Sequence, residues 1–446
     1  FRLAMNNHGS ITSDDKGRKS QTRRKAISVA FLILFTALIA YDNMALDGTI
    51  PLIQKHFSVS DSSTAIIKLF VSARTLSSMA TSIFETLRPA ILVDFYRDKS
   101  LSRAFMVVSL ADLFGSPISL SVTSWFVTSG LPWQSGLLPA TLISLFLVPV
   151  LAFVLPKGFG KTSKPNHANV FKAAVSILKN KSYTLIIIGI ACYMFYVKAI
   201  GFWYPSFFLS AWNFVPEVFL GLSYPGVSTI LSVVDLASTF IGLPVLMWIA
   251  ESWQFGSGLF KNRSGYPRAF PIIVFLSSVI NHFTALIGIF STDKNVIILL
   301  VSQFVSGIFG AAMIAMSNQM KMSVLASHQR ASGAALMQLT VSILTFPAAQ
   351  LFGMVSDSFR GDSQSLDDRY FSYRNALVVL WIFKAVTMVF GIALIYYYPG
   401  DYERAKDCGE EKIIDETETL LTRDNRSESM FEKALRSRRA TADSIY

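Results

Sequence analysis

The chain has 446 residues, of which 52% are hydrophobic and only 15% are charged, and its formal net charge is +11. Soluble proteins carry roughly a quarter charged residues, so this composition excludes an ordinary soluble protein and indicates a polytopic membrane protein. The excess Lys and Arg lie between the apolar runs and in the terminal segments, which is typical of membrane topology and predicts no nucleic-acid partner.

The segment 1–25 is polar and basic, and we expect it to form a cytosolic N-terminal tail. It has no apolar core, so it does not resemble a cleaved signal peptide. Because residue 1 is Phe rather than Met, we expect the natural chain to begin further upstream.

Crossing the apolar core of a bilayer takes about twenty residues per helix. Runs of this length at 26–47, 64–84, 103–126 and 134–155 predict an N-terminal helical half, 26–155, of about four helices. The run 64–84 is the weakest, because it carries Lys68 and Arg74. The polar segment 156–181 is predicted to be a cytosolic central loop.

The remaining runs predict a C-terminal helical half, 182–399, of about six helices. They lie at 182–208, 223–250, 268–291, 295–317, 331–354 and 374–398. The last segment, 400–446, is charged and polar, and we expect a disordered cytosolic tail.

Successive helices cross the membrane in opposite directions, so the loops between them alternate between its inner and outer sides. The charges of the loops agree with this alternation. The loops "YRDKSLSR" and "KNRSGYPR" fall on the inner side, whereas the outer loop "TSGLPWQS" has no Lys or Arg. The sequence therefore predicts an all-α polytopic membrane protein of about ten transmembrane helices (4 + 6), with both termini cytosolic.

Several ionisable residues interrupt the apolar runs. A charged side chain at mid-bilayer costs about 2.5–3.5 kcal/mol, so such residues face a protein interior or a water-filled cavity. The candidates are Asp42, Arg74, Asp112, Lys198, Asp235, His282 and Lys384. Asp235 is short and near the middle of its run, which favours a functional position; His282 is more simply read as a packing histidine. The long stem of Lys384 can reach the membrane interface, so this residue is left open between interface and interior.

The sequence has no Walker A loop, no zinc-binding His-Glu-x-x-His helix and no Gly-x-Ser-x-Gly elbow. We therefore expect a protein that is not an enzyme and that needs no cofactor and no metal. Buried titratable groups in a polytopic chain favour a secondary transporter; a channel or a receptor is the next class.

The segment "YDNMALDGTIPLIQKHFSVSDSS", 41–63, resembles the first helix and following loop of Spinster-type transporters of the major facilitator superfamily. The family pattern is Asp-Arg-x-Thr-x-x-Gly-x-x-Pro-x-Ile-Gln-x-x-Phe followed by Ser-Asp-Ser. The matching positions are Asp42, Gly48, Pro51, Ile53, Gln54, Phe57, Ser60, Asp61 and Ser62. Asn43 stands where the family has Arg.

A second block, "ARTLSSMATSIFETLRPAILVDFYRDKSLSR", resembles the fourth helix of that family and the loop after it, although Thr81 replaces the family's glutamate. The matches here are Arg74, Leu76, Pro89, Ile91, Asp94 and Arg103. Later, "GFWYPSFFL" and "AALMQLTVSILTFPAAQLFGMVSD" are similar to the seventh and eleventh helices. The family fold has twelve helices in two halves, so the order of these blocks implies that the second and third helices are missing near Phe70.

This resemblance implies a transporter of lysophospholipids or sphingoid phosphates, coupled to protons and acting as a monomer. Asp42 would carry the proton, and the substrate site would be formed by Arg74, Asp112, Lys198 and Asp235. The helices with His282 and Lys384 correspond to peripheral positions. The alternatives are a facilitator-superfamily carrier of a small organic anion, and a transport-dead relative or truncated isoform with a regulatory role.

The predicted tail contains "ETETLL", which fits an acidic dileucine sorting signal formed by Glu416, Leu420 and Leu421. This motif favours a lysosomal or late endosomal membrane over the plasma membrane, and an acidic lumen would supply a proton gradient.

Overall fold

The computed structural model describes residues 29–42, 98–131, 133–136, 170–261, 265–326, 329–361 and 365–443, and single positions within 27–96 and 138–145. Throughout these residues the regular secondary structure is helical, so the prediction of an all-α protein is confirmed. The long helices are α4 (Asp98–Thr128), α7 (Lys181–Phe214), α8 (Tyr224–Gln254), α9 (Ala269–Ser291), α10 (Val296–Ser323), α11 (Arg330–Thr345), α12 (Ala348–Arg360) and α13 (Leu366–Asp443). Shorter ones are α6 (Val170–Leu178), η1 (Trp133–Gly136), η2 (Pro216–Phe219) and η3 (Gly258–Phe260).

Seven described stretches are long and apolar enough to cross a membrane. They are Arg103–Phe126, Lys181–Phe214, Tyr224–Phe260, Ala269–Ser291, Val296–Ser323, Ser332–Arg360 and Leu366–Asp407. A shorter apolar helix, Val29–Asp42, lies within the first predicted run. The run 64–84 and the proposed gap near Phe70 lie outside the described residues, apart from position 84, so the expected total of about ten helices stays a prediction.

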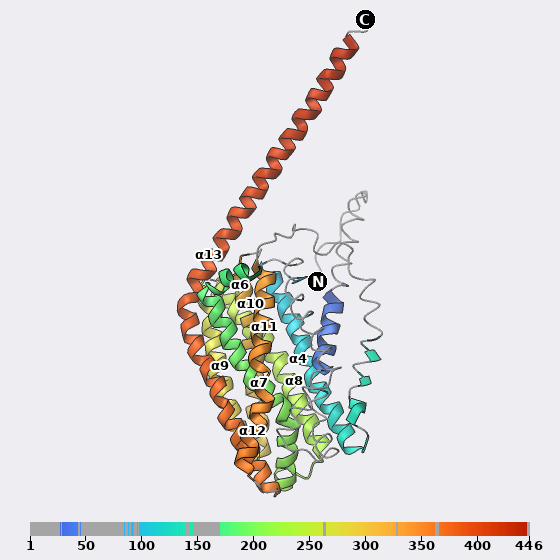
Figure 1. Ribbon diagram of the computed structural model, residues 1–446, viewed down its shortest axis with the longest axis vertical. Coiled ribbons are helices and arrows are strands. Elements are labelled where there is room, and N and C mark those ends of the chain that lie inside the picture. Colours follow the sequence, from blue (N-terminus) through green and yellow to red (C-terminus); the bar gives the residue numbers. More distant parts are fainter. Residues whose placement is uncertain are drawn as a thin grey trace.

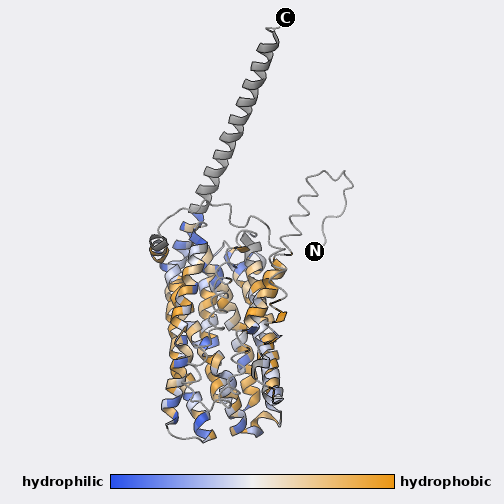
Figure 2. Ribbon diagram, turned by 45° about the vertical axis from the view of Figure 1, so that its right-hand side comes forward, coloured by the Kyte–Doolittle hydropathy of each residue, from blue (hydrophilic) through white to orange (hydrophobic). Residues whose placement is uncertain are grey.

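Helices α7 to α13 form one bundle, and α4 packs on α8 at its side (Figure 1). The helix Val29–Asp42 lies against α4, where Gly115 faces Ala37 and Tyr41. Within the bundle α13 packs on α7 and α9, and α10 packs on α8 and α9. The contact between α4 and α8 includes the edge-to-face pair of Phe114 and Phe240, whose ring centroids are 6.1 Å apart. Hydrophobic residues cover most of the length of the helices, and hydrophilic ones gather toward the two ends (Figure 2).

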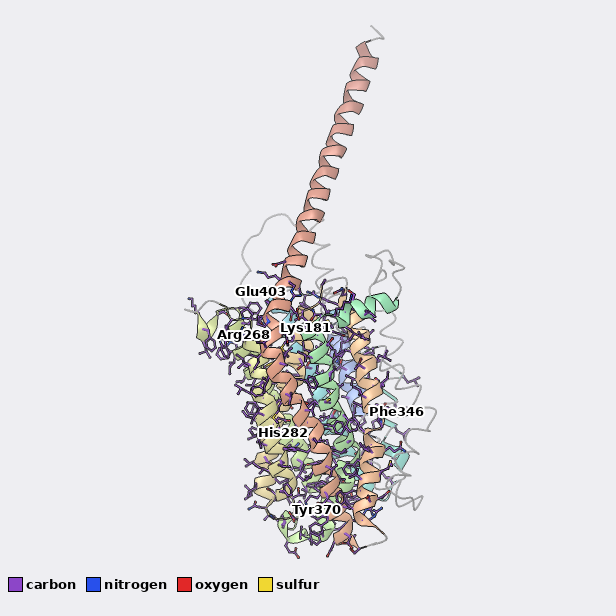
Figure 3. The ribbon with its side chains drawn as sticks, turned by 60° about the vertical axis from the view of Figure 1, so that its left-hand side comes forward. Lys181, Arg268, His282, Phe346, Tyr370 and Glu403 are labelled. Carbon is purple, nitrogen blue, oxygen red and sulfur yellow. The ribbon has the colours of Figure 1, made fainter. Side chains whose placement is uncertain are left out.

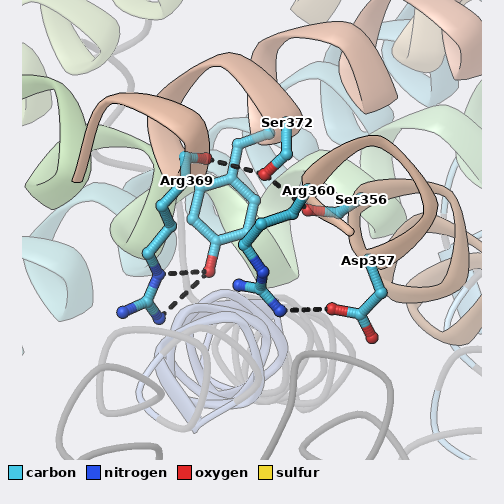
Figure 4. Close-up of polar contacts among 6 residues, drawn as sticks. Ser356, Asp357, Arg360, Arg369 and Ser372 are labelled. Atoms are coloured by element: carbon cyan, nitrogen blue, oxygen red, sulfur yellow. Dashed lines mark hydrogen bonds and ion pairs between the residues drawn. The ribbon is translucent and has the colours of Figure 1, made fainter. Parts of the chain in front are cut away.

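At one end of the bundle α12 turns back into α13 through a set of polar contacts (Figure 4). Arg360 pairs with Asp357 at 2.5 Å, and Ser356 donates a hydrogen bond to Ser372 across the two helices at 3.2 Å. Below them, Trp203 of α7 stacks on Phe352 of α12 with ring centroids 5.4 Å apart. The serine hydrogen bond thus joins α12 to α13, and the ring stack joins α12 to α7.

Helix α13 continues beyond the bundle to Asp443, and it leaves the bundle at the end opposite the α12–α13 turn (Figure 1). The segment has no Pro after Pro399, and it is rich in Glu, Lys, Arg, Ala and Leu, which favour the helix.

Helices α8 and α10 approach most closely at two glycines. A Cβ placed on Gly242 would lie 2.5 Å from the Ile308 Cα and 2.6 Å from the Ile308 carbonyl oxygen. One placed on Gly307 would lie 2.0 Å from Ser238 Oγ. Small residues at such contacts allow the close backbone packing that holds helices together in a membrane.

We predict that Gly242→Ala destabilises the protein by about 1–3 kcal/mol, because the new methyl group meets backbone atoms that cannot rotate away. The measurement is the thermal unfolding midpoint of the purified protein in detergent. Gly189→Ala is the matched control: its Cβ would meet Phe390 Cβ at 3.4 Å, an ordinary contact. Equal midpoints for the two variants would contradict the close approach of α8 and α10.

Candidate functional site

The structure places three of the five predicted site side chains. Asp42 is half-buried at the end of the helix Val29–Asp42, Asp235 is half-buried on α8, and Lys198 is exposed on α7. Asp112 belongs to α4, but its side chain lies outside the described residues, as does all of Arg74. The expected pairing of Asp42 with Arg74 therefore stays a prediction.

Asp235 faces helix α10. The side chain of Gln303 hydrogen-bonds its carboxylate, and Ser238 Oγ donates to the Asp235 backbone oxygen at 2.7 Å. A Cβ on Gly307 would lie 3.3 Å from Asp235 Oδ1, so the missing side chain of this glycine makes room for the carboxylate. The acid is thus held between two helices by an amide partner, as expected for a carboxylate inside the membrane.

Lys384 of α13 points into the bundle, with only 3% of its surface exposed. Its Nζ donates to the Asn281 backbone oxygen at 3.1 Å and lies 5.2 Å from the ring centroid of Tyr196 and 5.9 Å from that of Tyr193. Cation–π contacts of this kind stabilise a cation that has lost its hydration. Across the described part of the chain, no carboxylate forms an ion pair with it. The structure therefore assigns Lys384 to the interior and excludes the interface position that the sequence left open.

Asn281 of α9 links the lysine to α10. Its Nδ2 donates to the Ser306 backbone oxygen at 2.6 Å and to Ser306 Oγ at 2.9 Å. A Cβ on Gly310 would lie 2.8 Å from this Nδ2 and 3.1 Å from the Tyr193 hydroxyl. Tyr193 also lies near Asp235 of α8. Polar side chains from five helices therefore lie close together.

We call this group the interior polar cluster. It consists of Tyr193 and Tyr196 on α7, Asp235 on α8, Asn281 and His282 on α9, Gln303 and Ser306 on α10, and Lys384 on α13.

His282 is fully buried and stacks on Trp381 with ring centroids 3.6 Å apart, so it packs as the sequence favours. Figure 3 shows it about midway between the end that carries Lys181 and Glu403 and the end that carries Tyr370. Within the described residues, neither His282 nitrogen, nor the Tyr196 hydroxyl, nor Asn281 Oδ1 has a hydrogen-bond partner. Buried polar atoms without a hydrogen-bond partner are rare in native proteins, and a functional role of the site is one explanation for them.

The resemblance assigns the helix of Lys384 to a peripheral position, and the sequence does not single out Tyr193, Gln303 or Ser306. The adjacent pair Asn281-His282 inside the apolar run "FLSSVINHFTALIGIF" was a signal that could have identified α9 as a contributor. The tyrosines carried no such signal, because aromatic residues are common throughout the chain.

A bundle of long apolar helices that encloses acidic, basic and amide side chains is the architecture of a membrane transporter. Residues 17–343 match the model of the Major Facilitator Superfamily. The chain therefore belongs to the major facilitator superfamily. No curated protein matches the sequence.

The fold is similar to crystal structures of a bacterial homologue of the human lysosomal transporter Spinster. For the inward-facing, unoccupied conformation the TM-score is 0.57 at 12% sequence identity, covering 85% of this chain and 98% of that one. For the inward-facing, occupied conformation the TM-score is 0.55 at 12% identity, covering 84% and 98%. At this identity the likeness shows a shared fold.

We predict that Lys384→Met does not lower the unfolding midpoint in detergent. Any rise should be a few degrees, which corresponds to a gain in unfolding free energy of about 1 kcal/mol or more. Methionine has a similar length, and it removes a buried cation that has no carboxylate partner in the described residues. A gain in stability would indicate that the lysine is retained for function rather than for folding.

The control for this variant is Lys294→Met, which changes an exposed lysine between α9 and α10 and should have no effect on the midpoint. A clear fall in the midpoint of Lys384→Met, with none for the control, would show that the lysine's bond to Asn281 is structural.

Proposed function

We propose that this chain is a secondary active transporter that moves a lysophospholipid or a sphingoid phosphate across a membrane, coupled to protons. The observation that carries the proposal is the block 41–62, with its Asp42 and its Ser60-Asp61-Ser62, in a chain that belongs to the major facilitator superfamily. The likeness in fold to a bacterial homologue of Spinster supports it.

Proton coupling is assigned to Asp42. Its carboxylate ends an apolar helix and is half-buried, next to the buried Tyr41. Protonation removes the charge and with it most of the cost of holding the side chain away from water. An acid in this position can therefore favour one conformation of the transporter when protonated and another when ionised.

Substrate binding is assigned to Arg74, Asp112, Lys198 and Asp235. A phosphate head group is attracted to guanidinium and ammonium groups, so Arg74 and Lys198 would hold it, and the two carboxylates would orient its polar part. The apolar surfaces of the helices would contact the acyl or sphingoid chain. A small organic anion would need the same cations but not the apolar surface. The two substrate classes can therefore be distinguished by whether competition for uptake by lysolipids depends on their chain length.

The organisation of the chain is part of the proposal. We assign 1–25 and 400–446 to the cytosol, 26–155 and 182–399 to the two helical halves, and 156–181 to the loop between them. We also place the protein in the lysosomal or late endosomal membrane, where a proton gradient is present. If the second and third family helices are absent near Phe70, transport by this chain should be slow.

We predict that Asp42→Asn abolishes the pH dependence of lysophospholipid uptake into proteoliposomes, because the amide can neither gain nor lose a proton. Uptake is measured over a series of outside pH values at fixed inside pH. The control, Asp367→Asn, changes an exposed carboxylate at the start of α13 and should keep the wild-type profile. An unaltered profile in Asp42→Asn would exclude this residue as the proton carrier.

We predict that replacing Leu420 and Leu421 with Ala moves the protein from lysosomes to the plasma membrane, because adaptor recognition of the dileucine motif is lost. Fluorescence microscopy of the tagged chain and surface biotinylation measure the change. Replacing the nearby pair Ile413 and Ile414 with Ala is the control and should leave the distribution unchanged. The motif is inert if the two double variants have the same distribution.

A further inference from the structure

A cavity of about 210 Å³ lies at the end of the bundle from which α13 continues into the tail. It is lined by the first part of α4, the ends of α8 and α10, the start of α11, and α13. We propose that this cavity binds the phosphate-bearing head group of an anionic membrane lipid. The site is separate from the interior polar cluster, and the proposal does not depend on which substrate is transported.

Arg330, the first residue of α11, supplies the main cation. Its Nε donates to the Leu325 backbone oxygen at 3.3 Å. Among the described residues no carboxylate pairs with its guanidinium, which is half-buried beside the cavity. Burial lowers the pKa of Arg330 because the charged form loses hydration, yet an arginine stays protonated in proteins. The remaining N–H groups form the planar fork that fits phosphate oxygens.

The other polar groups of the cavity can also donate hydrogen bonds. The Tyr398 hydroxyl lies 2.9 Å from Ser323 Oγ, and Tyr402, one turn later on α13, stacks on Tyr398 with ring centroids 5.7 Å apart. Lys406 brings a second cation one further turn along, and Gln254 brings an amide. Among the described residues that line the cavity, Arg330 and Lys406 are cations and none is an acid, and such a lining favours an anion.

The position of the cavity favours a lipid over a free anion. The spans α8 and α10 end here, at Gln254 and Ser323, so the cavity lies where the helices leave the apolar layer. Lys181 and Arg268 lie at the same end of the bundle (Figure 3). Phe105 and Met322 add an apolar side to the cavity. A lipid could therefore place its phosphate against Arg330 while its glycerol and chains stay beside apolar groups.

The test is the binding of dioctanoyl phosphatidic acid to the full chain in detergent, followed as a concentration-dependent rise of the unfolding midpoint. We expect saturable binding, at least about tenfold weaker binding by Arg330→Gln, and weaker binding by Lys406→Gln, because each variant loses a charge-assisted hydrogen bond. Arg268→Gln, an exposed arginine at the same end outside the cavity lining, is the control and should bind like the wild type.

Three further measurements identify the ligand and the site. Dioctanoyl phosphatidylcholine should give a much smaller rise, since its choline cation opposes the two basic residues. Inorganic phosphate giving the same rise as the lipid would overturn the proposal of a lipid site. Asp42→Asn should bind phosphatidic acid normally, so a failure of the proposed transport mechanism leaves this test intact. Undiminished binding by both Arg330→Gln and Lys406→Gln would also overturn the proposal; Lys406→Gln, on an exposed part of α13, keeps the test available if Arg330→Gln does not fold.

Discussion

The bilayer interior offers no hydrogen-bond partners, so the polar groups that this chain carries into it depend on partners inside the bundle. Asp235 has the amide of Gln303, and Lys384 has the backbone oxygen of Asn281 and the faces of two tyrosines. These partners come from three helices: Gln303 from α10, Asn281 from α9 and both tyrosines from α7. The arrangement of α7 to α10 and α13 therefore depends on the same contacts that keep the charged groups in the membrane.

Glycines on α10 make this arrangement possible. Gly307 leaves room for Ser238 and Asp235, and Gly310, one turn later, leaves room for Asn281 and the Tyr193 hydroxyl. Both positions belong to the face of α10 that packs against its neighbours. Close backbone approach and space for polar side chains are thus obtained from the same small residues, which is consistent with how helices associate in membranes.

The two ends of the bundle differ in chemistry. At the α12–α13 turn, stacked aromatic rings join α7 to α12 and α13, and Arg374 of α13 pairs with Asp293 at 3.3 Å. At the other end, Arg330 and Lys406 line a cavity without a lining acid among the described residues. Helix α13 runs from one end of the bundle to the other and carries Lys384 between them. It therefore connects the cavity, the interior polar cluster and the tail.

The sequence by itself determined the class, because its long apolar runs require helices that cross a membrane. Seven of the predicted runs coincide with apolar helices of the described residues, since a helix in lipid satisfies its backbone hydrogen bonds internally and needs only an apolar surface. It also favours an interior position for Asp235, since a short side chain in the middle of an apolar run cannot reach the interface. Only the tertiary structure decided the location of Lys384. Its long side chain could reach either the membrane interface or the interior, and the positions of α7 and α9 around it fix the interior. The same holds for Tyr193, Gln303 and Ser306, which are ordinary residues in sequence and become a polar cluster only where five helices meet, because helix packing rather than spacing along the chain brings them together.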